Sequence, residues 1–211
     1  MRALNCSTAS PEKDHMTRRT MRGFSLIEMM IVVSIILITS SIFFMSIQPA
    51  LKQARLTNAY NSVLMTMRRA RENSIAERRV YIVSFIAPRT MTITQAATGL
   101  VTNTFTLPTD VSFDAEPGIP NTAAKTPDHF GTASAAIDFD QGVSLGVKTQ
   151  VYFQPDGSAQ DANSNINNGV VYIARTGDVL SSRAITVWGS TGRLRGWRLY
   201  TVAGVKTWSQ Q

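Results

Sequence analysis

The chain has 211 residues, of which 44% are hydrophobic and 17% charged, with a formal net charge of +7. This length suits one membrane anchor and one soluble domain large enough to bury a core. Residues 1–23 contain 5 basic and 2 acidic residues, so residues 24–211 have 16 basic and 12 acidic residues, a net charge of +4 that is too small to indicate a nucleic-acid-binding tail. The single cysteine, Cys6, excludes an intramolecular disulfide.

An apolar run of 19 residues extends from Met29 to Ile47. Its only polar residues carry hydroxyls that can bond back to their own helix, and about 20 such residues span a bilayer. These polar residues are Ser34, Thr39, Ser40, Ser41 and Ser46. Five basic residues precede the run, against Glu12 and Asp14: Arg2, Lys13, Arg18, Arg19 and Arg22. The positive flank predicts a cytoplasmic N-terminus and a C-terminal part carried across the membrane.

Glu28 stands at the start of this run, where nothing in the segment offers it a cation. An ionised side chain at the bilayer centre costs about 2.5 to 3.5 kcal/mol on insertion scales. We therefore expect its partner to come from outside the segment. An ordinary secretory signal is not indicated, because its apolar core has about 7 to 15 residues and a small-x-small cleavage site.

The segment Gly23-Phe24-Ser25-Leu26-Ile27-Glu28 resembles the processing site of type IV pilins and type II secretion pseudopilins. The resemblance implies that prepilin peptidase removes residues 1–23 by cutting after Gly23, and that Phe24 is then N-methylated. It also implies that Glu28 pairs with the new terminal amine of a neighbouring subunit. A plain signal anchor, with Glu28 near the interface, is the alternative. A start at Met16 or Met21 would shorten the leader without altering the mature chain.

Residues 24–48 are expected to form a transmembrane and assembly helix, and residues 49–79 its amphipathic continuation. Pro49 either kinks one long helix or marks its exit from the bilayer. The expected buried face comprises Leu56, Tyr60, Val63, Leu64, Met67, Ala70 and Ser74. The other face carries Lys52, Arg55, Arg68, Arg69, Arg71, Arg78 and Arg79. That basic face is either simply solvated or a surface for nucleic acid or lipid headgroups.

From Val80 the apolar residues recur with a period of two, which predicts β-strands. We expect strands at 80–86, 91–94, 101–107, 151–153, 170–174, 184–188 and 194–201, with another near Asp138 and Asp140. The fold class is α+β: a long N-terminal helix, membrane-embedded in its first half, packed on an antiparallel β-sheet domain of residues 80–211. Residues 114–135 and 161–169 are expected to be surface loops.

Within the pilin group, the remaining sequence resembles the GspH and FimT type of minor subunit. The likeness rests on the passage from Met67 to Val83, on Val151-Tyr152-Phe153-Gln154-Pro155-Asp156-Gly157-Ser158, and on Gly192-Arg193-Leu194-Arg195. It implies a minor pilin or pseudopilin of the bacterial inner membrane, with a periplasmic C-terminal domain. Its partners would be other pilin subunits, prepilin peptidase and the assembly platform. No cofactor is implied.

In FimT-like pilins, a Gly-Arg-x-Arg segment near the C-terminus is associated with DNA binding during natural transformation. Arg193 and Arg195 would lie on one face of a strand, with Arg198 and Lys206 extending the charge. Trp197 and Trp208 would be available to stack on bases. The alternative is a glycine turn that leads into a strand with two exposed arginines.

An enzyme is the third class of function to weigh. His129 has no cysteine or second histidine near it in the sequence, so no zinc site is indicated. Ser134 lies outside any Gly-x-Ser-x-Gly elbow, and no phosphate-binding glycine loop precedes a helix. Asp138 and Asp140 would share a strand face, as either a calcium site or an exposed acidic edge. The sequence therefore predicts no catalytic site.

Overall fold

The computed structural model describes residues 23–122, 130–131, 135–141 and 149–211, without the side chains of Asp140 and Gln141. One helix is followed by ten strands: α1 (Leu26–Glu77), β1 (Tyr81–Ile86), β2 (Thr90–Gln95), β3 (Leu100–Thr106), β4 (Ile137–Gln141), β5 (Gln150–Phe153), β6 (Ala159–Gln160), β7 (Asn168–Arg175), β8 (Asp178–Trp188), β9 (Arg193–Val202) and β10 (Val205–Gln210). The predicted α+β class is confirmed. The chain forms two compact units, one ending at Ser46 and one spanning Ile47–Gln211.

In the first unit, α1 exposes its apolar side chains on every side. By length and composition this helix could cross a membrane, and none of its most apolar stretch is buried. The hydroxyls of Ser34, Thr39 and Ser41 donate to carbonyl oxygens three or four residues earlier, at 2.7 to 3.1 Å. The expectation that hydroxyls in the apolar run bond within their own helix is confirmed for these three residues.

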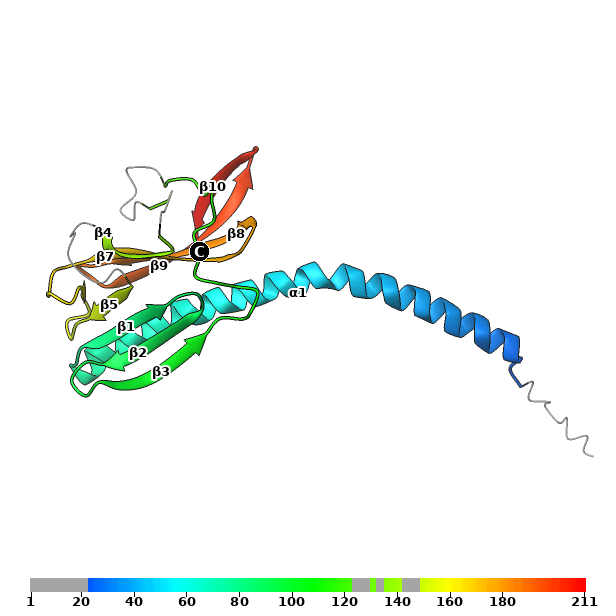
Figure 1. The fold of residues 1–211 in the computed structure, drawn as a ribbon, viewed down its shortest axis with the longest axis horizontal. Coiled ribbons are helices and arrows are strands. Elements are labelled where there is room, and N and C mark those ends of the chain that lie inside the picture. Colours follow the sequence, from blue (N-terminus) through cyan, green and yellow to red (C-terminus); the bar gives the residue numbers. More distant parts are fainter. Residues whose placement is uncertain (1–22, 123–129, 132–134, 142–148) are drawn as a thin grey trace, which may run out of the picture. The chain divides into compact units, whose positions relative to one another are not determined.

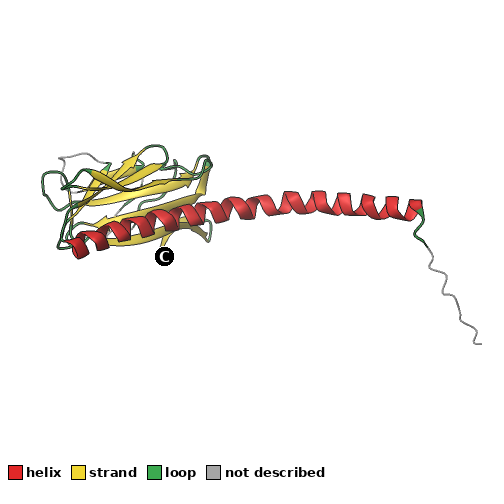
Figure 2. Cartoon of the chain, turned by 90° about the horizontal axis from the view of Figure 1, so that it is seen from below, coloured by secondary structure: helices red, strands yellow, loops and turns green. Residues whose placement is uncertain are grey.

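In the second unit, α1 continues beyond Pro49 to Glu77 and buries one face. Every residue of the predicted buried face is buried, and Ala59 joins it. All of these side chains except that of Ser74 share one core with residues from both sheets, including Val83 of β1 and Ile185 of β8. Figure 2 shows this part of the helix lying along the strands. The helix therefore owes its place in the domain to burial against both sheets.

The strands form two antiparallel five-stranded sheets, in the orders β3-β2-β1-β5-β6 and β10-β9-β8-β7-β4 (Figure 1). All the expected strands are present, with ends that differ by a few residues. The short β6 and the C-terminal β10 are missing from the sequence-based prediction. The prediction also did not include the division into two sheets. Alternation of apolar and polar residues identifies a strand but does not specify which strands pair with it.

A second apolar cluster covers the face of the β10–β4 sheet that points away from α1. It contains Ile119, Phe130, Val170, Tyr172, Ala184, Trp197, Leu199 and Trp208. Ile119 and Phe130 come from the segment expected to be a surface loop, and both are at most 5% exposed. The described part of 114–122 and 130–131 forms no helix or strand, as expected of a loop, but it does not lie wholly at the surface, because these two apolar side chains cover a sheet.

The second expected loop, 161–169, is also more ordered than a surface decoration. Asp161 is 4% exposed, and its Oδ1 accepts hydrogen bonds from the backbone N–H groups of Asn163 and Asn165 at 2.8 and 2.9 Å. These bonds lower the pKa of Asp161 against the opposing effect of its burial, which is the largest single influence. Asn168 already belongs to β7. The loop is therefore a short side-chain-stabilised turn between strands.

Candidate functional site

The predicted processing site lies just before the first helical residue. Gly23, Phe24 and Ser25 are outside α1, which begins at Leu26, and Phe24 is 76% exposed. The first backbone hydrogen bond of the helix runs from Met29 N to Ser25 O, at 3.1 Å. The bond between Gly23 and Phe24 thus carries no helical hydrogen bond. A peptidase could bind this stretch extended without unwinding the helix.

Glu28 occupies the first turn of α1 and is exposed. A carboxylate in the first turn is favourably placed, because the unpaired N–H groups there give that helix end a partial positive charge. Among the described residues, no cation lies within ion-pair distance of Glu28. The geometry leaves its carboxylate available to an external amine.

The segment Gly192-Arg193-Leu194-Arg195 forms the turn after β8 and the start of β9. Arg193 lies opposite Trp188, and Arg195 lies opposite Thr186. Arg193, the first residue of β9, is exposed at the end of the strand. Since alternate residues of a strand share a face, Arg195 lies with Trp197 on the face of β9 that points away from α1. Leu194 points the other way, into the core shared with α1.

Arg198 does not extend this charged edge. It lies opposite Arg183 in the register of β8 and β9, on the sheet face that meets α1. Its guanidinium carbon lies 4.6 Å from the centre of the Tyr200 ring. The sequence-based prediction grouped Arg193, Arg195 and Arg198 because all three belong to one basic strand. Side chains alternate between the two faces of a strand, and Arg198 is an odd number of residues from Arg195, so these two lie on opposite faces.

Trp197 and Trp208 are also not available for stacking on bases. They are 7% and 8% exposed and pack around Phe130, each with a ring-centroid distance of 5.2 Å. Trp197 Nε1 donates to Thr186 Oγ1 at 3.0 Å, and Trp208 Nε1 donates to the carbonyl of Pro120 at 2.8 Å. Both tryptophans are structural, which corrects the expectation from sequence.

A groove of about 600 Å³ lies between α1 and the β8–β9 turn. Arg71 builds its floor by donating from Nε to the carbonyl of Gly157 at 3.0 Å and from Nη2 to that of Thr191 at 2.9 Å. Gly192 has φ of 60°, and a Cβ there would collide with the Gly157 carbonyl. The groove is lined by Arg68, Arg71, Glu72, Trp188, Thr191, Gly192, Arg193 and Leu194. Its lining includes three arginines and one glutamate, an excess of positive charge that favours an anion, and we call it the anion groove.

Little in the sequence indicates this groove. The basic face of α1 is expected to be solvated or to bind an anionic partner by itself, whereas Arg68 and Arg71 lie about 120 residues before the turn that completes the site. Arg69 and Arg78 remain exposed and do not line it. Only the packing of α1 on the β10–β4 sheet joins these arginines to Arg193.

A buried cation lies elsewhere between α1 and the same sheet. Arg183 is 2% exposed, and burial lowers its pKa to about 10, with a further lowering from Arg198, so it remains charged at neutral pH. Its Nη1 donates to the carbonyls of Ser181 and Ser182 at 3.1 and 3.0 Å. Nearby, burial raises the pKa of Tyr60 to about 12. Nothing in the sequence pattern separates Arg183 from an exposed strand arginine.

The residues considered for catalysis or metal binding do not form a site in the described part of the chain. His129 and Ser134 lie outside the described residues, as does the side chain of Asp140. Asp138 lies on β4, half-buried, and raises the pKa of the already desolvated Tyr172. No group of three histidine, cysteine or acidic side chains that could hold a metal is found among the described residues.

A comparison with known protein families gives a match at the N-terminal segment that contains Gly23, Phe24 and Glu28. Residues 18–44 match the family described as the prokaryotic N-terminal methylation motif. Comparison with curated protein sequences gave no match. Among solved structures, the chain is similar to the crystal structure of the type IV minor pilin FimU of Pseudomonas aeruginosa (strain PAO1). The TM-score is 0.41, with 11% identity over 66% of this chain and 85% of that chain, which is too distant to carry an argument.

Proposed function

We propose that this chain, whose N-terminal segment is that of a type IV pilin-like protein, is a minor subunit of a type IV pilus or of a type II secretion pseudopilus. Pilin-like proteins are structural components and not enzymes. In this proposal prepilin peptidase cuts between Gly23 and Phe24, Phe24 is N-methylated, and the domain from Ile47 onward lies in the periplasm. Initiation of the filament, or a place at its tip, would be the role of such a subunit.

The observation that carries the proposal is the matched motif at residues 18–44, which contains Gly23, Phe24 and Glu28. The helix that follows exposes its apolar side chains, so it needs a bilayer or neighbouring helices to cover them. Pairing of Glu28 with the terminal amine of an adjacent subunit would remove an uncompensated charge from that apolar setting. The same contact would fix the axial position of one subunit against the next.

The test is a Glu28→Ala variant expressed with the other subunits of its assembly. We expect the leader to be removed normally, as shown by the mass of the N-terminal peptide, while the variant stays in the inner membrane fraction and fails to enter filaments. Glu72→Ala is the matched control, because Glu72 is also an exposed glutamate on α1. Normal incorporation of the Glu28 variant into filaments would refute the assembly role.

DNA binding is a second candidate function, favoured by the meeting of Arg193 with Arg68 and Arg71 in one groove. Guanidiniums on two elements could contact successive phosphates, while Arg195, further along β9, adds positive charge nearby. Arg198 would not contribute directly, since it lies on the other face. Such binding would depend mainly on phosphate contacts and would show little sequence preference.

This candidate is tested by measuring the affinity of the full chain in detergent for double-stranded DNA over a salt series. The Arg193→Ala, Arg195→Ala double variant should bind weakly and show a shallower salt slope, by about 1 for each phosphate that it no longer binds. An Arg69→Ala, Arg78→Ala variant removes the same charge outside the groove and should bind nearly normally. Equally weakened binding in both double variants, or no binding by the parent, would argue against the site.

A further inference from the structure

Five cationic residues lie on the first turns of α1 in the domain or contact them from the sheet, and we call them the collar: Lys52, Arg55, Arg175, Arg183 and Arg198. Lys52 and Arg55 come from α1 itself, and the other three come from β7, β8 and β9. The collar is separate from the anion groove, which lies more than one helical turn further along α1, at Arg68 and Arg71.

Hydrogen bonds fix the collar against one short stretch of α1. Arg175 Nη2 donates to the carbonyl of Lys52 at 2.8 Å. With the oxygen and nitrogen of the Gln53 amide exchanged, which is the orientation that satisfies both atoms, its oxygen accepts from Arg183 Nη2 at 2.9 Å and from Arg198 Nη2 at 3.3 Å. Three guanidiniums from three strands are thus held at two consecutive helix residues.

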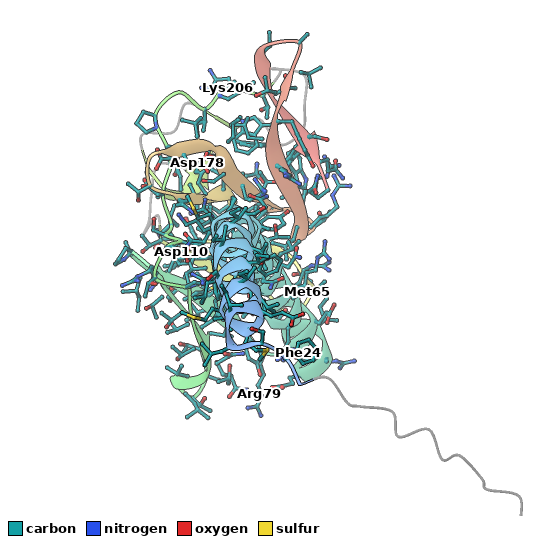
Figure 3. The ribbon with its side chains drawn as sticks, turned by 90° about the vertical axis from the view of Figure 1, so that its right-hand side faces the viewer. Phe24, Met65, Arg79, Asp110, Asp178 and Lys206 are labelled. Atoms are coloured by element: carbon teal, nitrogen blue, oxygen red, sulfur yellow. The ribbon has the colours of Figure 1, made fainter. Side chains whose placement is uncertain are left out.

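The acidic residues that meet the collar do not balance its charge. Asp110 Oδ2 lies 3.9 Å from Arg55 Nη1, and Asp178 Oδ2 lies 3.5 Å from Arg175 Nη1. Both carboxylates are labelled in Figure 3. Within the described residues, Arg183, Arg198 and Lys52 have no carboxylate in ion-pair range. Three of the five positive charges therefore lack a counter-ion from the described part of the chain.

Unpaired hydrogen-bond donors accompany this excess of charge. The Nε atoms of Arg175 and Arg198 and the buried hydroxyl of Tyr60 have no hydrogen-bond partner in the described chain. Arg183 is buried behind them, with only carbonyl and amide oxygens as acceptors. These atoms are buried, as are both carboxylate oxygens of Asp110, which also lack a hydrogen-bond partner. An anion at the nearby surface would therefore act on the excess positive charge and would not bond to these buried atoms.

The collar lies close in sequence to the end of the apolar run. Lys52 follows Ile47, the last residue of that run, by five residues of continuous helix, which corresponds to about 7.5 Å of rise. The polar headgroup layer adds a similar thickness on each side of a hydrocarbon core of about 30 Å. If residues 29–47 span the bilayer, Lys52 and Gln53 lie at the depth of the lipid phosphates.

We propose that the collar binds the phosphate of an anionic phospholipid headgroup in the membrane leaflet next to the domain. The exposed Lys52 and Arg55 would meet the headgroup first, and the half-buried Arg198 would donate from its forked guanidinium to a phosphate oxygen. The buried charge of Arg183 strengthens the attraction without needing access. This proposal rests on the anchoring of α1 in a membrane, and it is independent of filament assembly and of DNA binding.

The test uses the full chain in zwitterionic detergent micelles, with the thermal unfolding midpoint of the domain as the readout. Addition of phosphatidylglycerol should raise the midpoint by about 2 to 4 °C at low salt, because a ligand that binds only the folded state stabilises it. The same mole fraction of phosphatidylcholine should have no such effect. Inorganic phosphate at equal concentration separates a headgroup site from a general anion site.

Two variants localise the effect. Lys52→Gln alters an exposed side chain and should fold normally while losing part of the response to phosphatidylglycerol; Lys52→Gln with Arg198→Gln should lose nearly all of it. Arg69→Gln with Arg78→Gln removes the same charge elsewhere and should retain the response. The proposal is overturned by any of three results: no response of the parent chain, an equal response to inorganic phosphate, or an equally reduced response in the control variant.

Discussion

The two parts of α1 differ in what covers their apolar side chains. From Leu26 to Ser46 the large apolar residues are exposed, as with Met30 at 63%, and their hydroxyl neighbours bond only within the helix. From Ile47 to Glu77 one face is buried, with Leu56, Val63 and Met67 at 0%. One continuous helix thus contains a segment that requires an outside apolar environment and a segment that the protein itself covers.

The difference shows where the stability of the fold resides. Side chains of the second segment pack against both sheets, so the domain gains its free energy of folding there. Apolar side chains of the first segment have no such cover within the described chain and need lipid or neighbouring subunits to bury them. Substitutions in the two segments should therefore have separable effects on domain stability and on membrane insertion or assembly.

The largest expected effect distinguishes two methionines of α1. Met67→Ala removes a fully buried side chain and should lower the free energy of unfolding by about 2 to 5 kcal/mol. Met30→Ala, in the exposed segment, should change it by no more than about 0.5 kcal/mol. Chemical denaturation of the full chain in detergent measures both, and Met65→Ala, at 59% exposure, is the control within the second segment. Similar costs for Met30 and Met67 would contradict the comparison.

The second prediction concerns alkaline pH and the buried Tyr60. Burial raises its pKa from 10.0 to about 12, so the folded state keeps a proton that the unfolded state loses. The stabilisation is complete below pH 10 and is lost as the pH rises to about 12, with a total of about 3 kcal/mol. Between about pH 10 and pH 12, the free energy of unfolding should therefore fall more steeply in the parent than in a Tyr60→Phe variant. Parallel pH profiles would show that Tyr60 titrates normally in the fold.

The third prediction tests the closeness of α1 to β9. A Cβ at Gly196 would overlap the Tyr60 hydroxyl, so Gly196→Ala should cost about 1 to 3 kcal/mol through overpacking. Adding Tyr60→Phe should recover much of this stability, since the hydroxyl has no partner among the described residues. A double-mutant cycle by urea denaturation gives the coupling free energy. If the free-energy changes of Gly196→Ala and Tyr60→Phe are additive, the overpacking at Gly196 does not involve the Tyr60 hydroxyl.

The smallest expected effect compares two serines of α1. Ser74 is buried, and its hydroxyl lies 2.6 Å from the Arg71 carbonyl and 3.0 Å from that of Gln154. Ser74→Ala removes the hydrogen bond to Gln154 and should cost about 1 kcal/mol. Ser34→Ala removes only a bond to Met30 within the exposed segment and should leave domain stability unchanged. Chemical unfolding curves of the two variants measure the difference. Equal stability of both variants would show that the hydrogen bond from Ser74 to Gln154 does not stabilise the domain.

The candidate sites also differ between the two parts of α1, in whether their residues are adjacent in the sequence. The segment from Gly23 to Glu28 is continuous in sequence, so its motif was recognisable without any fold, and the family match covers it. The anion groove and the collar each join α1 to strands more than 100 residues away. Their arginines resemble ordinary exposed residues until packing brings them together.

The sequence by itself determined the membrane-type helix, the buried face of its second part, and nearly all the strands, because each depends on a local periodicity. Tertiary structure alone decided that the strands form two sheets, that Ile119 and Phe130 cover one of them, and that Trp197 and Trp208 are buried. It also decided that Arg198 faces α1 while Arg195 faces away. The physical reason is that pairing and burial depend on contacts between residues distant in the chain, which no local pattern specifies.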